Sequence, residues 1–227
     1  MTTIDAWFHG LPPFTKYYFC SAMVSATLTT FEIISPYSLN FVLTRVLNNL
    51  EAWRILTTFI FFGSFSFGFI ISLAILVRFT RALETHPTYN QDFASFIWAI
   101  LMMATIMLFF SLFTNVTFLG SGLLFALLYV WSKLDPQQIV PFYGGFVVKA
   151  YQFPFVLLGI RVLMGGNIMD DLIGLLAGHI YYMLKEQIPQ EYGYDLAKTP
   201  DFFRRLILQP GAPRQQQAYQ GRGFRLG

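Results

Sequence analysis

Charged side chains are scarce in this sequence of 227 residues, and cysteine is almost absent. Asp, Glu, Lys and Arg together make up 12% of the residues, well below the share of about 25% that is usual in soluble domains. The single cysteine, Cys20, excludes an internal disulfide framework. The sequence also lacks a metal-ligand cluster, a phosphate-binding loop, a dinucleotide-binding fingerprint and a nucleic-acid motif. We therefore expect no metal, no cofactor and no nucleic-acid partner.

Apolar residues dominate instead. Hydrophobic residues make up 55% of the chain and aromatic residues 19%. Ile55–Val77 carries no charge and is long enough to cross a bilayer. The uncharged stretch Phe93–Ser132 has 40 residues, which is too long for one membrane helix and suits two. These features predict an all-α membrane protein.

The hydropathy pattern predicts six membrane spans followed by a polar tail. The predicted spans are Tyr17–Phe31, Ile55–Val77, two helices within Phe93–Ser132 that meet near Thr114–Asn115, Ala150–Gly165 and Met169–Lys185. We expect residues 1–188 to form one membrane domain. Residues 189–227 should form a flexible tail, in which Thr199-Pro200-Asp201 begins a short helix.

Lysine and arginine are unevenly distributed over the two sides of this predicted bundle. With six spans both termini lie on one side, and that side holds twelve of the fifteen basic residues. The other side holds only Arg45 and Arg54, and Arg161 lies within the fifth span. Because cytosolic loops are enriched in Lys and Arg, both termini are predicted to be cytosolic.

The first loop, Ser35–Arg54, is predicted to contain a helix that lies in the membrane interface. Its apolar residues recur at helical spacing and are Leu39, Leu43, Val46, Leu47 and Leu50. The loop ends in Trp53-Arg54. Trp favours the headgroup level and Arg can extend to lipid phosphates, so we expect these two residues to hold the helix against the bilayer.

The sixth span contains two glycines four residues apart, Gly174 and Gly178, followed by His179. Glycines at this spacing allow another membrane helix to approach closely. We expect that helix to be either the fourth span or a helix of a partner subunit. An ionisable side chain inside a hydrophobic span is costly, so His179 is a candidate functional residue, with a hydrogen-bonded packing role as the alternative.

Three further charged residues lie in or next to the last two spans. Asp170 and Asp171 begin the sixth span, where negative charge complements the helix dipole. Arg161 interrupts the fifth span, and three roles remain open for it. Its guanidinium can extend to the interface, pair with Asp170 or Glu32, or line a polar cleft.

The combination of motifs resembles one family over nearly the whole chain. Its parts are Trp53-Arg54 in the first loop, Leu128-Tyr129-Val130-Trp131 closing the fourth span, and Gly174-Leu-Leu-Ala-Gly178-His179 in the sixth. Together they are similar to the derlins, members of the rhomboid superfamily. The segment Gly221-Arg-Gly-Phe-Arg-Leu-Gly227 resembles the short motif by which derlins bind the AAA ATPase valosin-containing protein. The residues assigned to this motif are Gly223, Phe224, Arg225, Leu226 and Gly227.

This resemblance implies a rhomboid-like six-helix bundle in the endoplasmic reticulum membrane and a role in endoplasmic-reticulum-associated degradation. Derlins are described as pseudoproteases that help move misfolded lumenal and membrane proteins to the cytosol. The partners it implies are misfolded substrates, the ATPase, a membrane ubiquitin ligase complex and further subunits in a homo- or hetero-oligomer. Short or interrupted spans favour local bilayer thinning, and a polar cleft is the alternative route for a polar chain.

The resemblance also raises an alternative, an intramembrane serine protease. Rhomboid proteases take Ser from a Gly-x-Ser-Gly at the start of the fourth span and His from the sixth; Ser121 and His179 would fill these roles here. However, Leu119 replaces the first glycine, and no His or Asn lies between Arg54 and Glu84, where rhomboid proteases carry residues near the oxyanion. Losing an oxyanion donor typically lowers the rate about 100- to 1000-fold. We therefore expect a non-catalytic protein; a transporter or a structural membrane adaptor is a third alternative.

Overall fold

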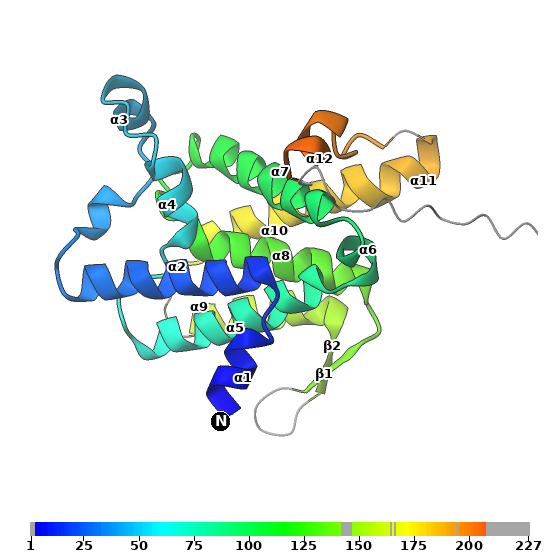
Figure 1. The fold of residues 1–227 in the computed structure, drawn as a ribbon, viewed down its shortest axis with the longest axis horizontal. Coiled ribbons are helices and arrows are strands. Elements are labelled where there is room, and N and C mark those ends of the chain that lie inside the picture. Colours follow the sequence, from blue (N-terminus) through cyan, green and yellow to red (C-terminus); the bar gives the residue numbers. More distant parts are fainter. Residues whose placement is uncertain (1–2, 142–146, 164, 166, 194, 208–227) are drawn as a thin grey trace, which may run out of the picture.

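The computed structural model describes residues 3–141, 147–163, 165, 167–193 and 195–207. Within these residues six longer helices form a bundle (Figure 1). They are α2 (Pro13–Thr30), α5 (Phe67–Glu84), α7 (Phe93–Ser111), α8 (Gly120–Leu134), α9 (Phe153–Leu163) and α10 (Met169–Tyr182).

Shorter elements connect or flank these helices. They are α1 (Thr3–His9), a 3-10 turn (Pro36–Ser38), α3 (Leu43–Asn48), α4 (Arg54–Ile60), α6 (Pro87–Asn90), a 3-10 turn (Ala150–Gln152), a π-helical segment (Met183–Gln187), α11 (Ile188–Tyr192) and α12 (Asp201–Ile207). Strands β1 (Ile139–Pro141) and β2 (Val147–Lys149) pair antiparallel, with Val140 opposite Val148.

Each of the six predicted spans overlaps one of the bundle helices. Among the described helices, α7 is long and apolar enough to cross a membrane by length and composition; Gly120–Leu134 and Ala150–Leu163 are apolar but shorter. How many helices cross the bilayer therefore stays a prediction. The predicted tail motif, residues 221–227, lies outside the described residues.

The structure corrects the prediction of the second span. The segment Ile55–Val77 is not one helix, because α4 ends at Ile60 and α5 begins only at Phe67. Between them Gly63 has a φ of 98°, a left-handed backbone that glycine adopts without strain. Ser66 then caps α5 by accepting a hydrogen bond from the Phe69 amide at 3.1 Å. The second bundle helix is thus displaced toward the C-terminus and ends beyond Arg81.

The structure also corrects the prediction of one interfacial helix in the first loop. Instead of one helix over Ser35–Arg54, the loop contains a 3-10 turn, the six-residue α3 and then α4, which begins at Arg54. One continuous helix is excluded because Leu50 has a φ of 57°, which lies outside the right-handed helical region. The apolar spacing of the loop was correctly read as helical only for the short stretch Leu43–Asn48.

Polar contacts at the two ends of the bundle show which helix ends lie together. The carboxylate of Glu84, at the end of α5, accepts hydrogen bonds from the amides of Phe14 and Thr15 at 2.9 Å each. These amides belong to the first turn of α2, whose N–H groups have no partner within the helix. At the other end of the bundle, the Leu119 amide donates to the carbonyl oxygen of Thr58 at 3.0 Å, so that the start of α8 lies beside α4.

Helix α8 occupies the centre of the bundle (Figure 1). Its residues from Gly122 to Ser132 are all buried. It packs against α10 more extensively than any other pair of described elements does, and it also contacts α5, α7 and α9. Near its C-terminal end the Trp131 ring lies 4.7 Å from that of Phe79 on α5. The α8–α10 pair is therefore the frame on which the candidate site is built.

Candidate functional site

Helices α8 and α10 meet backbone to backbone along a strip of small residues. A Cβ atom added at Gly174 would lie 1.9 Å from the carbonyl oxygen of Gly122, and one added at Gly178 would lie 2.7 Å from that of Ala126. From the first contact to the second, the residue number rises by four on both helices. The two helices therefore run parallel, and their residues keep the same pairing along the contact. Of the two partners expected for these glycines, the structure places the fourth bundle helix against them.

At the first turns of both helices, a serine faces a carboxylate. The hydroxyl of Ser121 on α8 donates a hydrogen bond to the carboxylate of Asp170 on α10. The adjacent Gly122 allows this approach, because a Cβ there would lie 2.4 Å from the carbonyl oxygen of Asp170. The residues opposite Ser121 are therefore the two aspartates that begin α10.

His179 lies further along the contact between α8 and α10, which we call the seam. Its Nδ1 atom is 2.7 Å from the hydroxyl of Tyr129 on α8, and the two rings meet edge to face. Gly174 on α10 lies opposite Gly122 on α8, and Ser121 directly precedes Gly122. His179 lies five residues beyond Gly174, which is about 7.5 Å further along the helix axis at 1.5 Å per residue. The expectation that Ser121 and His179 could face each other is therefore wrong, and the histidine is hydrogen-bonded to a neighbouring helix.

Arg161 joins α9 to the same region. Its Nη1 atom lies 2.7 Å from Oδ1 of Asp171, whose side chain is fully buried, while the Arg161 side chain is 34% exposed. Of the three roles left open for Arg161, the structure shows an ion pair, and its partner is Asp171 rather than Asp170 or Glu32. The two neighbouring aspartates bind different helices: Asp170 binds α8 and Asp171 binds α9. In addition to complementing the helix dipole, they hold the start of α10 in place.

This arrangement is not the Ser–His pair of a rhomboid protease, because Ser121 and His179 have other partners. A nucleophilic serine requires an adjacent general base and donors where the oxyanion develops. The hydroxyl of Ser121 donates to the carboxylate of Asp170 and not to an imidazole, and a second carboxylate, that of Asp171, belongs to the next residue. Negative charge at this position would destabilise an oxyanion rather than stabilise it. The site can hold helices together and present polar groups inside the bundle.

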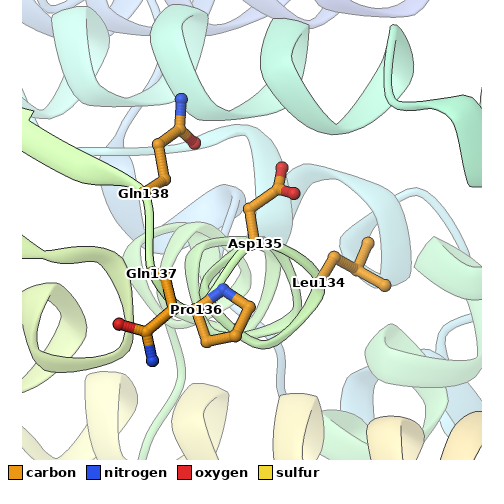
Figure 2. A pocket seen from close by; sticks show the side chains of 5 residues that line it. All are labelled: Leu134, Asp135, Pro136, Gln137 and Gln138. Carbon is orange, nitrogen blue, oxygen red and sulfur yellow. The ribbon is translucent and has the colours of Figure 1, made fainter.

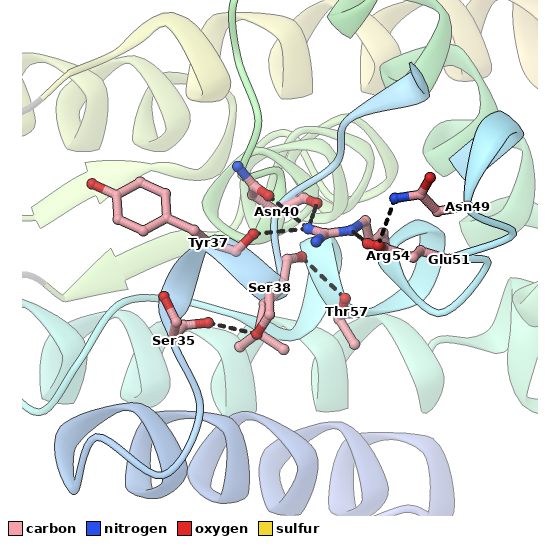
Figure 3. Close-up of polar contacts among 9 residues, drawn as sticks. Ser35, Tyr37, Ser38, Asn40, Asn49, Glu51, Arg54 and Thr57 are labelled. Carbon is pink, nitrogen blue, oxygen red and sulfur yellow. Dashed lines mark hydrogen bonds and ion pairs between the residues drawn. The ribbon is translucent and has the colours of Figure 1, made fainter. Parts of the chain in front are cut away.

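The first loop is organised around Arg54, as Figure 3 shows. The guanidinium Nη1 donates to the carbonyl oxygens of Tyr37 and Asn40 at 2.8 and 2.9 Å, and to Oδ1 of Asn40 at 2.8 Å. Nε donates to the carboxylate of Glu51. Arg54 is 2% exposed, so the expectation that it extends to lipid phosphates is wrong. It binds the loop backbone from inside.

The neighbours of Arg54 complete this picture. Hydrogen bonds from Arg54 and then from Asn49 lower the pKa of Glu51 below its usual range, so Glu51 stays ionised and paired at neutral pH. Trp53, by contrast, is 55% exposed, and Leu56 is also exposed. Of the Trp53-Arg54 motif, Trp53 is the residue available to the bilayer.

Replacing Arg54 with alanine is expected to disorganise the first loop, because the carbonyl oxygens of Tyr37 and Asn40 lose their donor. Limited proteolysis of the purified protein should then cut within residues 35–60 at least several times faster than in the parent. Trp53→Ala is the matched control, because its side chain is exposed and its loss leaves these hydrogen bonds intact. Equal cleavage rates for Arg54→Ala and Trp53→Ala would contradict the structural role of Arg54.

Two hollows lie away from Ser121 and His179. An apolar groove of about 450 Å³ lies between α2, α4 and α7 and includes Tyr18, Phe59 and Ile100. A smaller hollow of about 320 Å³ is formed by Leu134–Gln138 (Figure 2), at the opposite end of α8 from Ser121. Across the described part of the chain, no group of three or more His, Cys, Asp or Glu side chains is placed to hold a metal ion.

The fold and the seam together define a class: a helical membrane bundle in which the serine of a protease-like motif faces carboxylates. Comparison with known proteins gives the family. The Der1-like family model matches residues 11–201, and the chain belongs to this family. The Der1-like family is involved in endoplasmic-reticulum-associated degradation.

The chain is similar to several derlins over most of its length. It is 32% identical to Derlin-2 of Oryza sativa subsp. japonica, over 99% of this chain and 95% of that protein. It is also 32% identical to Derlin-2.1 of Zea mays, again over 99% and 95%. Identity to Derlin-1 of Arabidopsis thaliana is 32%, over 94% of this chain and 81% of that protein.

Sequence reasoning missed several partners in the site. It did not find Tyr129 as the partner of His179, nor Asp171 as that of Arg161. It also missed the loop carbonyls bound by Arg54. One usable signal was present: if Gly122 opposes Gly174, Ser121 must lie near the first turn of α10. The loop carbonyls had no signal in the side-chain pattern, because backbone acceptors are present at every residue.

Proposed function

We propose that this chain is a non-catalytic component of the endoplasmic reticulum retrotranslocation machinery. It would lie in the endoplasmic reticulum membrane with both termini in the cytosol and help move misfolded lumenal and membrane proteins to the cytosol for degradation by the ubiquitin–proteasome system. The observation that carries the non-catalytic part is the geometry of the seam. Ser121 is hydrogen-bonded to Asp170, and His179 is bound to Tyr129.

Short helices support local thinning of the bilayer as the mechanism. Helix α9 has 11 residues and α8 has 15, which correspond to about 16 and 22 Å at 1.5 Å per residue. The hydrocarbon core of a bilayer is about 30 Å thick. A helix shorter than this thickness favours a locally thinner bilayer. The ion pair of Arg161, at the C-terminal end of α9, adds polar groups to the same region.

Thinning addresses the main physical obstacle to retrotranslocation. A polar chain that crosses hydrocarbon leaves backbone N–H and C=O groups unpaired, and each such group costs several kcal/mol. A thinner and more polar path reduces the number of groups that are unpaired at one time. In this proposal Trp53 anchors the first loop at the interface, while Arg54 keeps that loop folded.

The proposed energy source is a AAA ATPase of the valosin-containing-protein type. The C-terminal residues Gly223 to Gly227 would recruit it, and a membrane ubiquitin ligase complex would modify the emerging substrate. Further subunits, in a homo- or hetero-oligomer, would complete the path. The ATPase motif is proposed from its sequence, because it lies outside the described residues.

Turnover of a misfolded endoplasmic reticulum substrate in cells tests this function. Deleting residues 221–227 should stall full-length substrate, because the membrane component loses its energy source, whereas Ser121→Ala should leave turnover unchanged. Deleting residues 214–220 is the matched control, because it removes the same length of tail outside the motif.

Two outcomes would overturn parts of the proposal. Loss of a discrete cleavage product in Ser121→Ala would show an active protease. Normal turnover after deletion of residues 221–227, with the truncated protein still in the membrane, would remove the ATPase-recruiting role of the motif.

A further inference from the structure

The polar segment after the bundle does not leave the molecule at α11 but returns to dock on α7 (Figure 1). Nη2 of Arg204 lies 2.7 Å from Oδ2 of Asp92, which caps the N-terminus of α7. The hydroxyls of Thr199 and Ser95 share a hydrogen bond of 2.8 Å. The Phe203 ring packs 5.1 Å from that of Trp98. Three different kinds of contact thus hold α12 and the residues before it.

These contacts fix the position of α12 along the axis of α7. They extend from Asp92, the cap, to Trp98, which is about 9 Å along the helix at 1.5 Å per residue. Helix α7 is the described helix that is long and apolar enough to cross a bilayer. If its apolar stretch spans the membrane, its first two turns lie at the boundary between headgroups and acyl chains, and α12 lies beside them at the same depth.

The outward face of α12 has the composition of a lipid-contact surface. Phe203 and Arg204 face α7, whereas Phe202 and Leu206, four residues apart, face outward and are 69% and 77% exposed. Arg205 is exposed between them in sequence. Residues four apart lie on one side of a helix, so this short helix presents two large apolar side chains and a cation outward.

We propose that this face of α12, formed by Phe202, Arg205 and Leu206, binds the phospholipid surface next to the start of α7. Phe202 and Leu206 insert at the acyl boundary, and Arg205 contacts lipid phosphates. Apolar area together with a cation is the pattern by which interfacial helices bind anionic membranes. A phospholipid monolayer is the occupant because, with α7 across the membrane, the docking contacts put this face at the membrane boundary. In addition, its exposed basic residue complements the negative charge of phosphates.

This arrangement determines where the C-terminal tail begins. From the end of the π-helical segment at Gln187 to Gly227 the chain has 40 residues, but only 20 follow Ile207. Twenty residues extend at most about 70 Å, half the maximum reach of forty. Membrane-bound α12 therefore limits how far from the bilayer anything bound at Gly227 can sit, whether or not the proposed ATPase is that partner.

Depth-dependent fluorescence quenching in reconstituted vesicles tests the proposal. The full chain in a Cys20→Ser background would carry one cysteine, Phe202→Cys, Leu206→Cys or the control Tyr192→Cys, labelled with an environment-sensitive dye. Tyr192 on α11 is also 69% exposed but is not docked on α7. We expect blue-shifted emission and quenching by phospholipids with brominated acyl chains at positions 202 and 206, and quenching by aqueous iodide at position 192.

The role of Arg205 is tested separately by vesicle composition. Adding phosphatidylserine to phosphatidylcholine vesicles should increase acyl-chain quenching at position 206, and Arg205→Gln should abolish this increase. Iodide quenching at positions 202 and 206 as strong as at position 192 would overturn the proposal and leave the face to a protein partner. This result is independent of substrate turnover, so it can fail while the proposed function holds.

Discussion

Replacing Gly174 with alanine is expected to separate α8 from α10 and to lower the free energy of unfolding by about 3 kcal/mol or more. The added Cβ would lie 1.9 Å from the carbonyl oxygen of Gly122 and 2.7 Å from its Cα. Both atoms are backbone, so no side-chain rotation relieves the overlap. Overpacking a well-packed interior usually costs about 1–3 kcal/mol, and a backbone overlap on the central helix belongs at the upper end of that range.

Gly159→Ala is the matched control for this prediction. Gly159 lies on α9, and no atom lies within 4 Å of a Cβ added there. Alanine is preferred over glycine in a helix by about 1 kcal/mol, so this variant should be slightly stabilised. Thermal unfolding in detergent measures both. Equal midpoints for Gly174→Ala and Gly159→Ala would contradict the backbone contact between the two helices.

The second large effect is expected when Arg161 is replaced with methionine. The carboxylate of Asp171 is fully buried and pairs with this guanidinium at 2.7 Å, and its Oδ2 has no hydrogen-bond partner among the described residues. Removing one member of a buried ion pair typically costs about 3–5 kcal/mol, because the other charge stays buried without a partner. Since the Arg161 side chain is about one-third exposed, water replaces part of the interaction, and we expect a loss of about 2–4 kcal/mol.

A double-mutant cycle separates the pair from the packing of its members. Arg161→Met combined with Asp171→Asn removes both charges and should recover most of the stability lost in Arg161→Met alone. Arg161→Lys should lose less than methionine, because it keeps the charge. If the double variant were as unstable as the sum of the two single variants, the ion pair would contribute nothing, and the losses would reflect packing.

Much of the fold was readable from hydropathy. Long uncharged stretches, the turn between the third and fourth helices, and the glycines of the sixth helix all appear in the sequence as local patterns. The break at Phe61–Ser66 was missed for a related reason. It contains no charged residue, and hydropathy reports how favourably a segment leaves water but not whether its backbone stays helical. The local signals for the break were Gly63 and the two serines, Ser64 and Ser66.

The sequence by itself determined that this is a helical membrane protein of the Der1-like family, because composition and motifs do not depend on how helices are arranged. Only the tertiary structure decided the site. Ser121 faces Asp170 and not His179, because the contact of Gly122 with Gly174 sets the offset of α8 and α10. Arg54 turns inward because backbone carbonyls distant in sequence surround it. Which side chains meet depends on helix offset and loop path, and neither quantity is local to any segment of the chain.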